Sequence, residues 1–283
     1  MEGFQVSWDL TLVQWILAGT CGILIGLSKT GVSGVGLAVV PILAVIFGSK
    51  PSTGLLLPML IMADVFAVKY YHRHAQWSHV FKLLPWAIIG ITLAMFLGQS
   101  VSSNQFSIIL SSSILVGVGL MIWQDVRGKQ IKVPDNWWFA ALMGLVGGFT
   151  TMIGNAAGPI MSLYLLSMRL PKNHFIGTGA WFFLIINLVK VPLHVFVWKT
   201  IDSSTFVFDL LMFPLIMAGA FLGIRVVKKI PEKPYRILVI TTTILAASIV
   251  FIKSGAGKGS SNQPVKQEKN IIPVKKLGSI INR

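Results

Sequence analysis

Long hydrophobic segments separated by short polar loops fill most of the chain. Six of them have the length of one membrane-spanning helix: 51–71, 83–101, 106–124, 174–198, 206–226 and 237–253. About 20 apolar residues suffice for a helix to cross a hydrocarbon core roughly 30 Å thick. Two other hydrophobic runs, 10–48 and 137–168, are too long for one simple span. The pattern predicts an all-α, polytopic integral membrane protein with about eight transmembrane segments.

The two over-long runs are interrupted by glycine, hydroxyl and amide residues. The interruptions read "SKTGVSGVG" at 28–36 and "TTMIGNAAG" at 150–158. An ordered series of matches relates the surrounding sequences: Gly22 and Gly26 align with Gly144 and Gly148 at an offset of 122, and Asp64 aligns with Asn187 at an offset of 123. Such a series predicts an internal repeat. We expect two homologous halves, 1–130 and 131–253, followed by a basic, disordered tail at 254–283.

The charges in the loops predict how the two long runs enter the membrane. Only 12% of the residues are charged, yet the formal net charge is +15. If each long run goes in and returns as a hairpin, nearly all loop cations fall on one side, as the positive-inside rule requires. Those cations are Arg73, Lys82, Arg127, Lys129, Lys132, Arg169, Lys172, Arg225, Lys228, Lys229, Lys233 and Arg236. Hairpins also give each half five membrane-entering elements, so the halves are inverted and the interrupted segments are re-entrant. Basic loops of this kind indicate anionic membrane lipid rather than nucleic acid as the partner.

The interrupted segments are the predicted functional site. Irregular backbone inside a bilayer is tolerated only where it is buried in protein or lines a wet cavity. A helix that restarts after a turn presents unpaired N–H groups and a positive dipole end to an anion. With inverted halves, the two turns are expected to converge near the midplane. The predicted substrate-binding residues are Ser28, Lys29, Thr30, Gly31, Ser33, Gly34, Thr150, Thr151, Gly154, Asn155, Gly158, Asn187 and Lys190.

Several of these positions have a second interpretation. Glycines four residues apart, such as Gly22 and Gly26 or Gly144 and Gly148, are typical of close helix packing, which is the interpretation we favour for them. Lys29 either binds the anion or extends to an interface. Asp64, an ionisable residue inside a span, either carries a coupling proton or pairs structurally with a lysine.

The sequence does not point to an enzyme, a cofactor or a metal site. It contains no plausible Ser-His-Asp set, no HExxH and no paired carboxylates. The histidines in "YYHRHAQWSH" have no further ligands nearby, and Cys21 is the single cysteine.

The segments "GLSKTGVSGVGLAVVPIL", "GLVGGFTTMIGNAAGPIMSLYLL" and "MRLPKNHFIGTGAWFFLIINLVKVPLH" resemble the TauE/SafE family of membrane anion exporters. The resemblance extends to about Lys253. It implies export of sulfite or a small organosulfur anion across the cytoplasmic (inner) membrane, with no enzymatic step. Two departures are the sequence "IGNAAG", where the family has a denser glycine cluster, and Lys29.

The sequence therefore predicts a secondary transporter that works by alternating access, with one half rocking against the other and protons as the candidate coupling ion. A passive anion channel and a non-transporting membrane scaffold are the alternatives. A homo-oligomer is compatible with the sequence.

Overall fold

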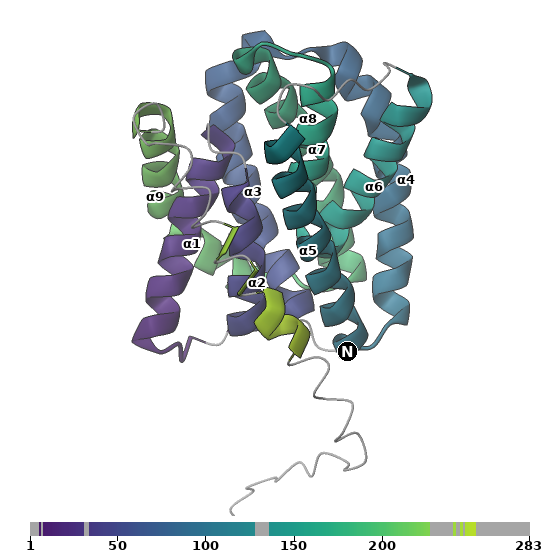
Figure 1. Ribbon diagram of the computed structural model, residues 1–283. Coiled ribbons are helices and arrows are strands. Elements are labelled where there is room, and N and C mark those ends of the chain that lie inside the picture. Colours follow the sequence, from purple (N-terminus) through teal and green to yellow (C-terminus); the bar gives the residue numbers. More distant parts are fainter. Residues whose placement is uncertain are drawn as a thin grey trace, which may run out of the picture.

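The computed structural model is helical throughout the membrane-embedded part that it describes. The described residues are 6, 8–30, 34–127, 136–226, 240–241, 244–245 and 247–252. The helices labelled in Figure 1 are α1 (Leu12–Thr30), α2 (Val35–Phe47), α3 (Ser49–Tyr71), α4 (Trp77–Ser100), α5 (Ser103–Arg127), α6 (Trp137–Gly154), α7 (Gly158–Ser167), α8 (Lys172–Pro192) and α9 (Ser203–Val226). A short 3-10 helix, His72–His74, follows α3, and a π-helical turn, Leu193–Val197, follows α8.

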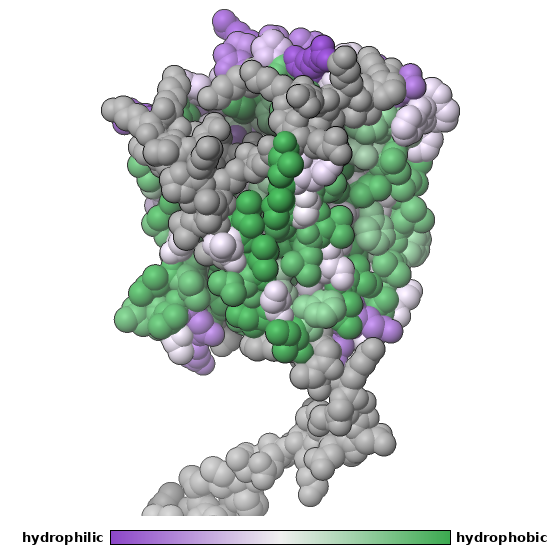
Figure 2. All heavy atoms as spheres, viewed as in Figure 1, coloured by the Kyte–Doolittle hydropathy of each residue, from purple (hydrophilic) through white to green (hydrophobic). Residues whose placement is uncertain are grey.

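Seven helices in the described ranges are long and apolar enough to cross a membrane: α1, α3, α4, α5, α6, α8 and α9. Helices α2 and α7 are shorter, with 13 and 10 residues. Each over-long hydrophobic run thus divides into a long and a short helix. Figure 2 shows hydrophobic side chains over the middle of the visible face and hydrophilic ones toward its ends. The prediction of a polytopic all-α membrane protein is confirmed, although the predicted segment at 237–253 is described only in part, at 240–241, 244–245 and 247–252.

Helices α1 and α2 form a hairpin. The ring of Phe208 contacts Trp15, in the first turn of α1, at a centroid distance of 5.7 Å and Phe47, at the end of α2, at 5.4 Å. The start of α1 and the end of α2 therefore lie at the same level, so the chain reverses between them. Gly34, at the start of α2, has φ of 95°, a left-handed conformation that glycine adopts without steric strain.

Helices α6 and α7 form a second hairpin. Phe139, in the first turn of α6, stacks on Tyr164, near the end of α7, at a centroid distance of 5.9 Å. Tyr164 in turn bonds His79 at the start of α4, with 3.0 Å between the phenol oxygen and Nδ1. This hairpin therefore opens at the end of the bundle where α4 begins.

The two hairpins enter from opposite ends of the bundle. We call the end that carries the α3–α4 and α7–α8 loops the basic end, because Arg73, Lys82 and Arg169 lie there. The other end carries the α2–α3, α4–α5 and α8–α9 loops, with Lys50 and Lys199, and we call it the sparse end. The α1–α2 hairpin opens at the sparse end and the α6–α7 hairpin at the basic end.

Glycines bring pairs of parallel helices into backbone contact. A Cβ atom on Gly26 of α1 would lie 2.1 Å from the carbonyl oxygen of Ile216 in α9, and one on Gly148 of α6 would lie 2.0 Å from that of Ala87 in α4. Neither position can carry a side chain without separating the helices. The packing interpretation of these two glycines is confirmed.

The helix contacts divide the bundle into two groups. Helices α1, α3 and α9 pack on one another, and α4 packs on both α6 and α8. The principal contact between the groups is that of α3 with α8. Each group therefore contains helices from both predicted halves of the sequence.

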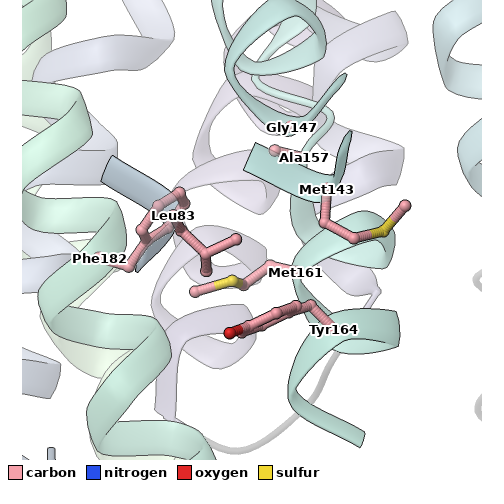
Figure 3. Close-up of a pocket in the computed structure, with 7 residues that line it drawn as sticks. All are labelled: Leu83, Met143, Gly147, Ala157, Met161, Tyr164 and Phe182. Atoms are coloured by element: carbon pink, nitrogen blue, oxygen red, sulfur yellow. The ribbon is translucent and has the colours of Figure 1, made fainter. Parts of the chain in front are cut away.

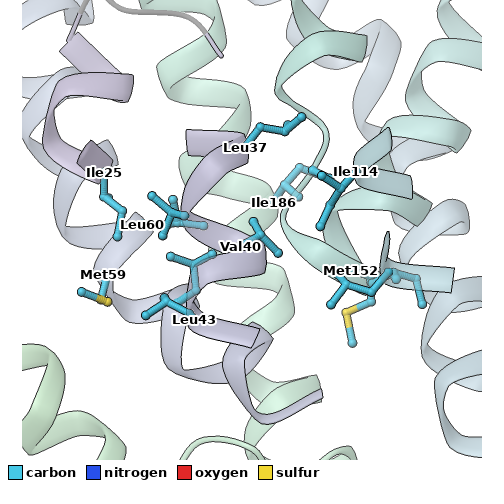
Figure 4. Close-up of a cluster of buried hydrophobic side chains, with 14 of the residues drawn as sticks. Ile25, Leu37, Val40, Leu43, Met59, Leu60, Ile114, Met152 and Ile186 are labelled. Carbon is cyan, nitrogen blue, oxygen red and sulfur yellow. The ribbon is translucent and has the colours of Figure 1, made fainter. Parts of the chain in front are cut away.

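The main apolar core lies between the hairpins and α3, α5 and α8. Figure 4 shows part of it, with Ile25 from α1, Val40 from α2, Met59 from α3, Ile114 from α5, Met152 from α6 and Ile186 from α8. These side chains hold the hairpins against the central helices α3 and α8, which carry the polar residues of the candidate site.

Candidate functional site

The C-terminal end of α6 is shaped to present polar groups inside the bundle. Asn155 follows the last helical residue with φ of 52°, and its backbone N–H donates to the carbonyl of Thr151 at 2.9 Å. This left-handed conformation is one that asparagine adopts more readily than most residues, and it ends the helix. The Asn155 side-chain amide donates to the carbonyl of Thr53 in α3 at 3.2 Å, so the turn also contacts the other helix group.

Lys190 on α8 reaches this turn from within the bundle. Its Nζ donates to the Thr151 carbonyl at 3.0 Å, to Thr151 Oγ1 at 3.1 Å and to Asn155 Oδ1 at 2.5 Å. The lysine is completely buried. All three acceptors are neutral, and no carboxylate in the described part of the chain forms an ion pair with Lys190.

A second polar cluster joins α1, α3 and α8. Lys29 Nζ lies 2.8 Å from Asp64 Oδ1, and Asn187 Nδ2 donates to Asp64 Oδ2 at 2.7 Å. Lys29 also lies over the ring of Phe183, 4.3 Å from its centroid. The Asp64 side chain is 0% exposed and that of Lys29 14%. Lys29 therefore points inward and does not extend to an interface, and its contact with Asp64 is the structural pairing that was one interpretation of Asp64.

The two clusters are adjacent on α8. Asn187 and Lys190 are three residues apart, close to one turn, and so lie on nearly the same face. Together the clusters contain two ammonium groups, Lys29 and Lys190, and one carboxylate, Asp64. If all three are ionised, the buried charge is +1. A bound monovalent anion would balance it.

The turns themselves do not meet near the midplane, in contrast to the expectation from sequence. Helix α1 has 19 residues and α6 has 18, so each spans about 27 Å at about 1.5 Å per residue. Thr30 lies against Gly223, near the end of α9 at the basic end, whereas Asn155 bonds Thr53, near the start of α3 at the sparse end. The long arms carry the turns past each other, and the residues of α3 and α8 lie between them.

Other predicted residues are placed differently. Three hydroxyls donate back to carbonyls of their own helix: Ser28 to Ile25 at 2.8 Å, Thr30 to Gly26 at 3.1 Å and Thr150 to Val146 at 2.9 Å. Gly154 packs on Leu110, Gly158 begins α7, and Gly34 packs on Met121. Gly31 and Ser33 lie outside the described residues.

The buried polar residues that sequence reasoning missed include Asp209, His194 and Thr200. Asp209 in α9 is fully buried, and neither carboxylate oxygen has a hydrogen-bond partner among the described residues. His194 and Thr200, beyond the end of α8, are also buried. The sequence does signal His194, because it follows Lys190 by four residues and so continues the same helix face.

An apolar pocket lies between the arms of the α6–α7 hairpin and helices α4 and α8 (Figure 3). Its lining consists of Leu83, Met143, Gly147, Ala157, Met161, Tyr164 and Phe182. The lining contains no charged group. This pocket therefore lacks the chemistry for a small inorganic anion, unlike the clusters on α8.

Comparisons with known proteins agree with the membrane architecture. A family model described as sulfite exporter TauE/SafE matches residues 17–250, which include every residue of the two clusters and both hairpins apart from the start of α1. Comparisons with curated proteins and with solved structures gave no match.

Proposed function

The chain belongs to the TauE/SafE sulfite exporter family, and from this premise we propose that it exports sulfite or a related organosulfur anion across the cytoplasmic membrane. The family is one of multi-pass membrane transporters, not enzymes. We place the anion beside Lys190, with the polar groups of Thr151 and Asn155 around it. Lys29, Asp64 and Asn187 form the adjoining part of the site.

The observation that carries the proposal is the environment of Lys190. A buried ammonium group is costly unless it is paired with an opposite charge. Its three partners are neutral, and the one carboxylate nearby on the same network, Asp64, already bonds Lys29 and Asn187. A small oxyanion would supply the missing negative charge and accept charge-assisted hydrogen bonds.

The helix groups suggest how access could alternate. The α1/α3/α9 group carries Lys29 and Asp64, and the α4/α6/α8 group carries Asn187 and Lys190. Among the described residues, three hydrogen bonds cross between the groups: Asn187 to Asp64, Asn155 to Thr53 and Lys50 to the Gly98 carbonyl. Rocking of one group against the other would break one or more of these bonds and open the site to one side at a time. The moving bodies in this proposal are these cross-paired groups, rather than the two halves of the sequence.

Proton coupling is assigned to Asp64. Protonation of this carboxylate would remove the charge that holds Lys29 and weaken acceptance of the Asn187 hydrogen bond. The contact between the helix groups would then respond to a proton, which links the proton gradient to the rocking motion.

Sulfite flux into and out of proteoliposomes containing the full chain tests the proposal. We expect saturable flux and accelerated exchange when unlabelled sulfite is present on the far side, which is the behaviour of a carrier rather than a channel. Lys190→Met should reduce kcat/KM at least about tenfold, the loss expected for a hydrogen bond to a charged group. Lys69→Met, which removes an exposed lysine of α3, is the matched control and should leave flux unchanged. Normal flux in a folded Lys190→Met variant would refute the proposed site, and flux linear in sulfite would indicate the channel.

A further inference from the structure

His194 occupies an unusual position one turn beyond Lys190. The π-helical turn Leu193–Val197 interrupts the regular continuation of α8, and such turns occur often at functional sites. It places His194 inside the protein, where the side chain is 0% exposed. The direction from Lys190 to His194 along α8 leads toward the sparse end.

One ring nitrogen of His194 is fixed and the other is available. Nδ1 lies 2.8 Å from Thr200 Oγ1, and the backbone N–H of Thr200 donates to the His194 carbonyl at 2.9 Å. Thr200 is itself held against α3, because a Cβ atom on Gly54 would lie 2.4 Å from its Oγ1. Nε2 is buried and has no hydrogen-bond partner among the described residues. Buried polar atoms in proteins are almost always paired, so an unpaired one at a fixed position calls for a further partner, which a ligand can supply.

An aromatic side chain and a lysine lie beyond His194 toward the sparse end. The indole of Trp198 lies between His194 and Lys50: its ring centroid is 5.1 Å from that of His194, and Lys50 Nζ lies 5.1 Å from the Trp198 ring. Lys50 is held there by donation to the Gly98 carbonyl at 2.8 Å, and Trp198 by donation to the Met95 carbonyl at 3.2 Å. Lys50 is partly exposed near the start of α3. Nitrogen donors of Lys190, His194 and Lys50 therefore follow one another from the buried site toward this end.

We propose that His194 is a second binding station for the transported anion, between Lys190 and the sparse end, and that Nε2–H is the group that contacts it. The inference rests on the proposed function, since it extends the same anion route. With Thr200 donating its hydroxyl proton to Nδ1, the neutral imidazole carries its own proton on Nε2 and can donate it to an oxyanion. The anion leaves Lys190 for His194 and then passes the ring of Trp198 to reach Lys50.

The test is sulfite flux through full-length variants in proteoliposomes. His194→Leu removes the donor and should lower kcat/KM for sulfite at least about tenfold. His194→Gln places an amide N–H near the position of Nε2 and should stay within a few-fold of the original protein. His174→Leu changes a histidine at the opposite end of the same helix, where Nδ1 lies 3.1 Å from Gln76 Nε2, and should have no effect. Monodispersity and the melting temperature in detergent identify variants that fail to fold.

Each outcome separates the second station from the first. If Lys190→Met loses flux while a folded His194→Leu variant keeps it, the second station is refuted and the proposed function stands. If the original protein shows no saturable flux, the proposed function fails and this inference fails with it. Should His194→Leu not fold, the isosteric pair His194→Gln and His194→Glu decides: the carboxylate offers no donor and repels an anion, so equal flux through both variants would overturn the proposal.

Discussion

The Asp64–Lys29 ion pair gives the sharpest test of the electrostatic argument. Asp64→Asn would remove the only carboxylate in the two clusters, so their charge would rise from +1 to +2 if both lysines remain ionised. The Lys29 ammonium, 2.8 Å from Asp64 Oδ1 and 14% exposed, would lose its counter-charge without gaining access to water. Removal of one partner of a buried pair destabilises proteins by about 3–5 kcal/mol. We expect a loss of this size in the free energy of unfolding.

A double-mutant cycle separates the pair from other effects of the substitution. Lys29→Met keeps an unbranched side chain over Phe183 and removes the charge, so the double variant contains neither ion. We expect it to recover about 2 kcal/mol relative to the sum of the two single losses, within the range measured for contacting residues. The free energy of unfolding would be obtained by titration with SDS in mixed dodecyl maltoside micelles. Additive losses, or a loss below about 1 kcal/mol for Asp64→Asn alone, would refute the assignment of Lys29 and Asp64 as a buried ion pair.

The same variants test coupling in proteoliposomes. If Asp64 carries the coupled proton, sulfite flux through Asp64→Asn should no longer respond to an imposed pH gradient, although exchange of sulfite at equal pH should persist. A flux that responds to the gradient as the original protein does would exclude Asp64 as the coupling residue.

Three further tests use substitutions elsewhere in the bundle. Gly148→Val should destabilise the protein by about 3 kcal/mol or more, because the new side chain would meet backbone atoms of Ala87, which cannot move aside as a side chain can. Gly119→Ala is the control: a Cβ atom there meets nothing within 4 Å, so the melting temperature in detergent should be unchanged. Asn155→Asp should abolish saturable sulfite flux because its carboxylate would neutralise Lys190. Asn155→Gly, which keeps the left-handed turn, should raise KM roughly tenfold. Saturable flux through Asn155→Asp with the KM of the original protein would contradict the role of Lys190 as anion ligand. Phe208→Ala should cost about 3–5 kcal/mol in unfolding free energy, since it removes the ring that joins the two arms of the α1–α2 hairpin, and an unchanged value would show that the hairpin does not depend on this contact.

The membrane architecture was accessible from sequence because it follows from one-dimensional signals. Hydrophobic length located the spans, and the distribution of loop cations favoured hairpins over single passes. The aromatic contacts of Phe208 and Phe139 are consistent with those hairpins. The alignment of Asp64 with Asn187 at an offset of 123 indicated two equivalent positions, and these side chains are hydrogen-bonded to each other.

The depth and partners of the polar groups were not accessible in the same way. Lys190 was recognisable as a residue deep in a span, but its contact with Thr151 and Asn155 depends on how far α6 extends beside α8. The long arm of each hairpin, about 27 Å at the usual helical rise, carries its turn past the midplane, which a count of polar residues does not reveal. His194 and Asp209 were missed because burial depends on helix rotation and neighbouring helices, which the pattern of one segment does not fix.

The pairing of α1 with α9 has a consequence for biogenesis. The glycine face of α1 is covered by the last of the nine labelled helices, and the two contact residues, Gly26 and Ile216, are 190 positions apart. At about 5–20 residues per second, a ribosome needs roughly 10–40 s to synthesise the segment between them. During that interval the first helix is already made but its partner is not, so its small-residue surface must be shielded by lipid or by the insertion machinery. The amino-terminal hairpin can therefore reach its final position only late in synthesis, and truncation before α9 leaves it without its main partner.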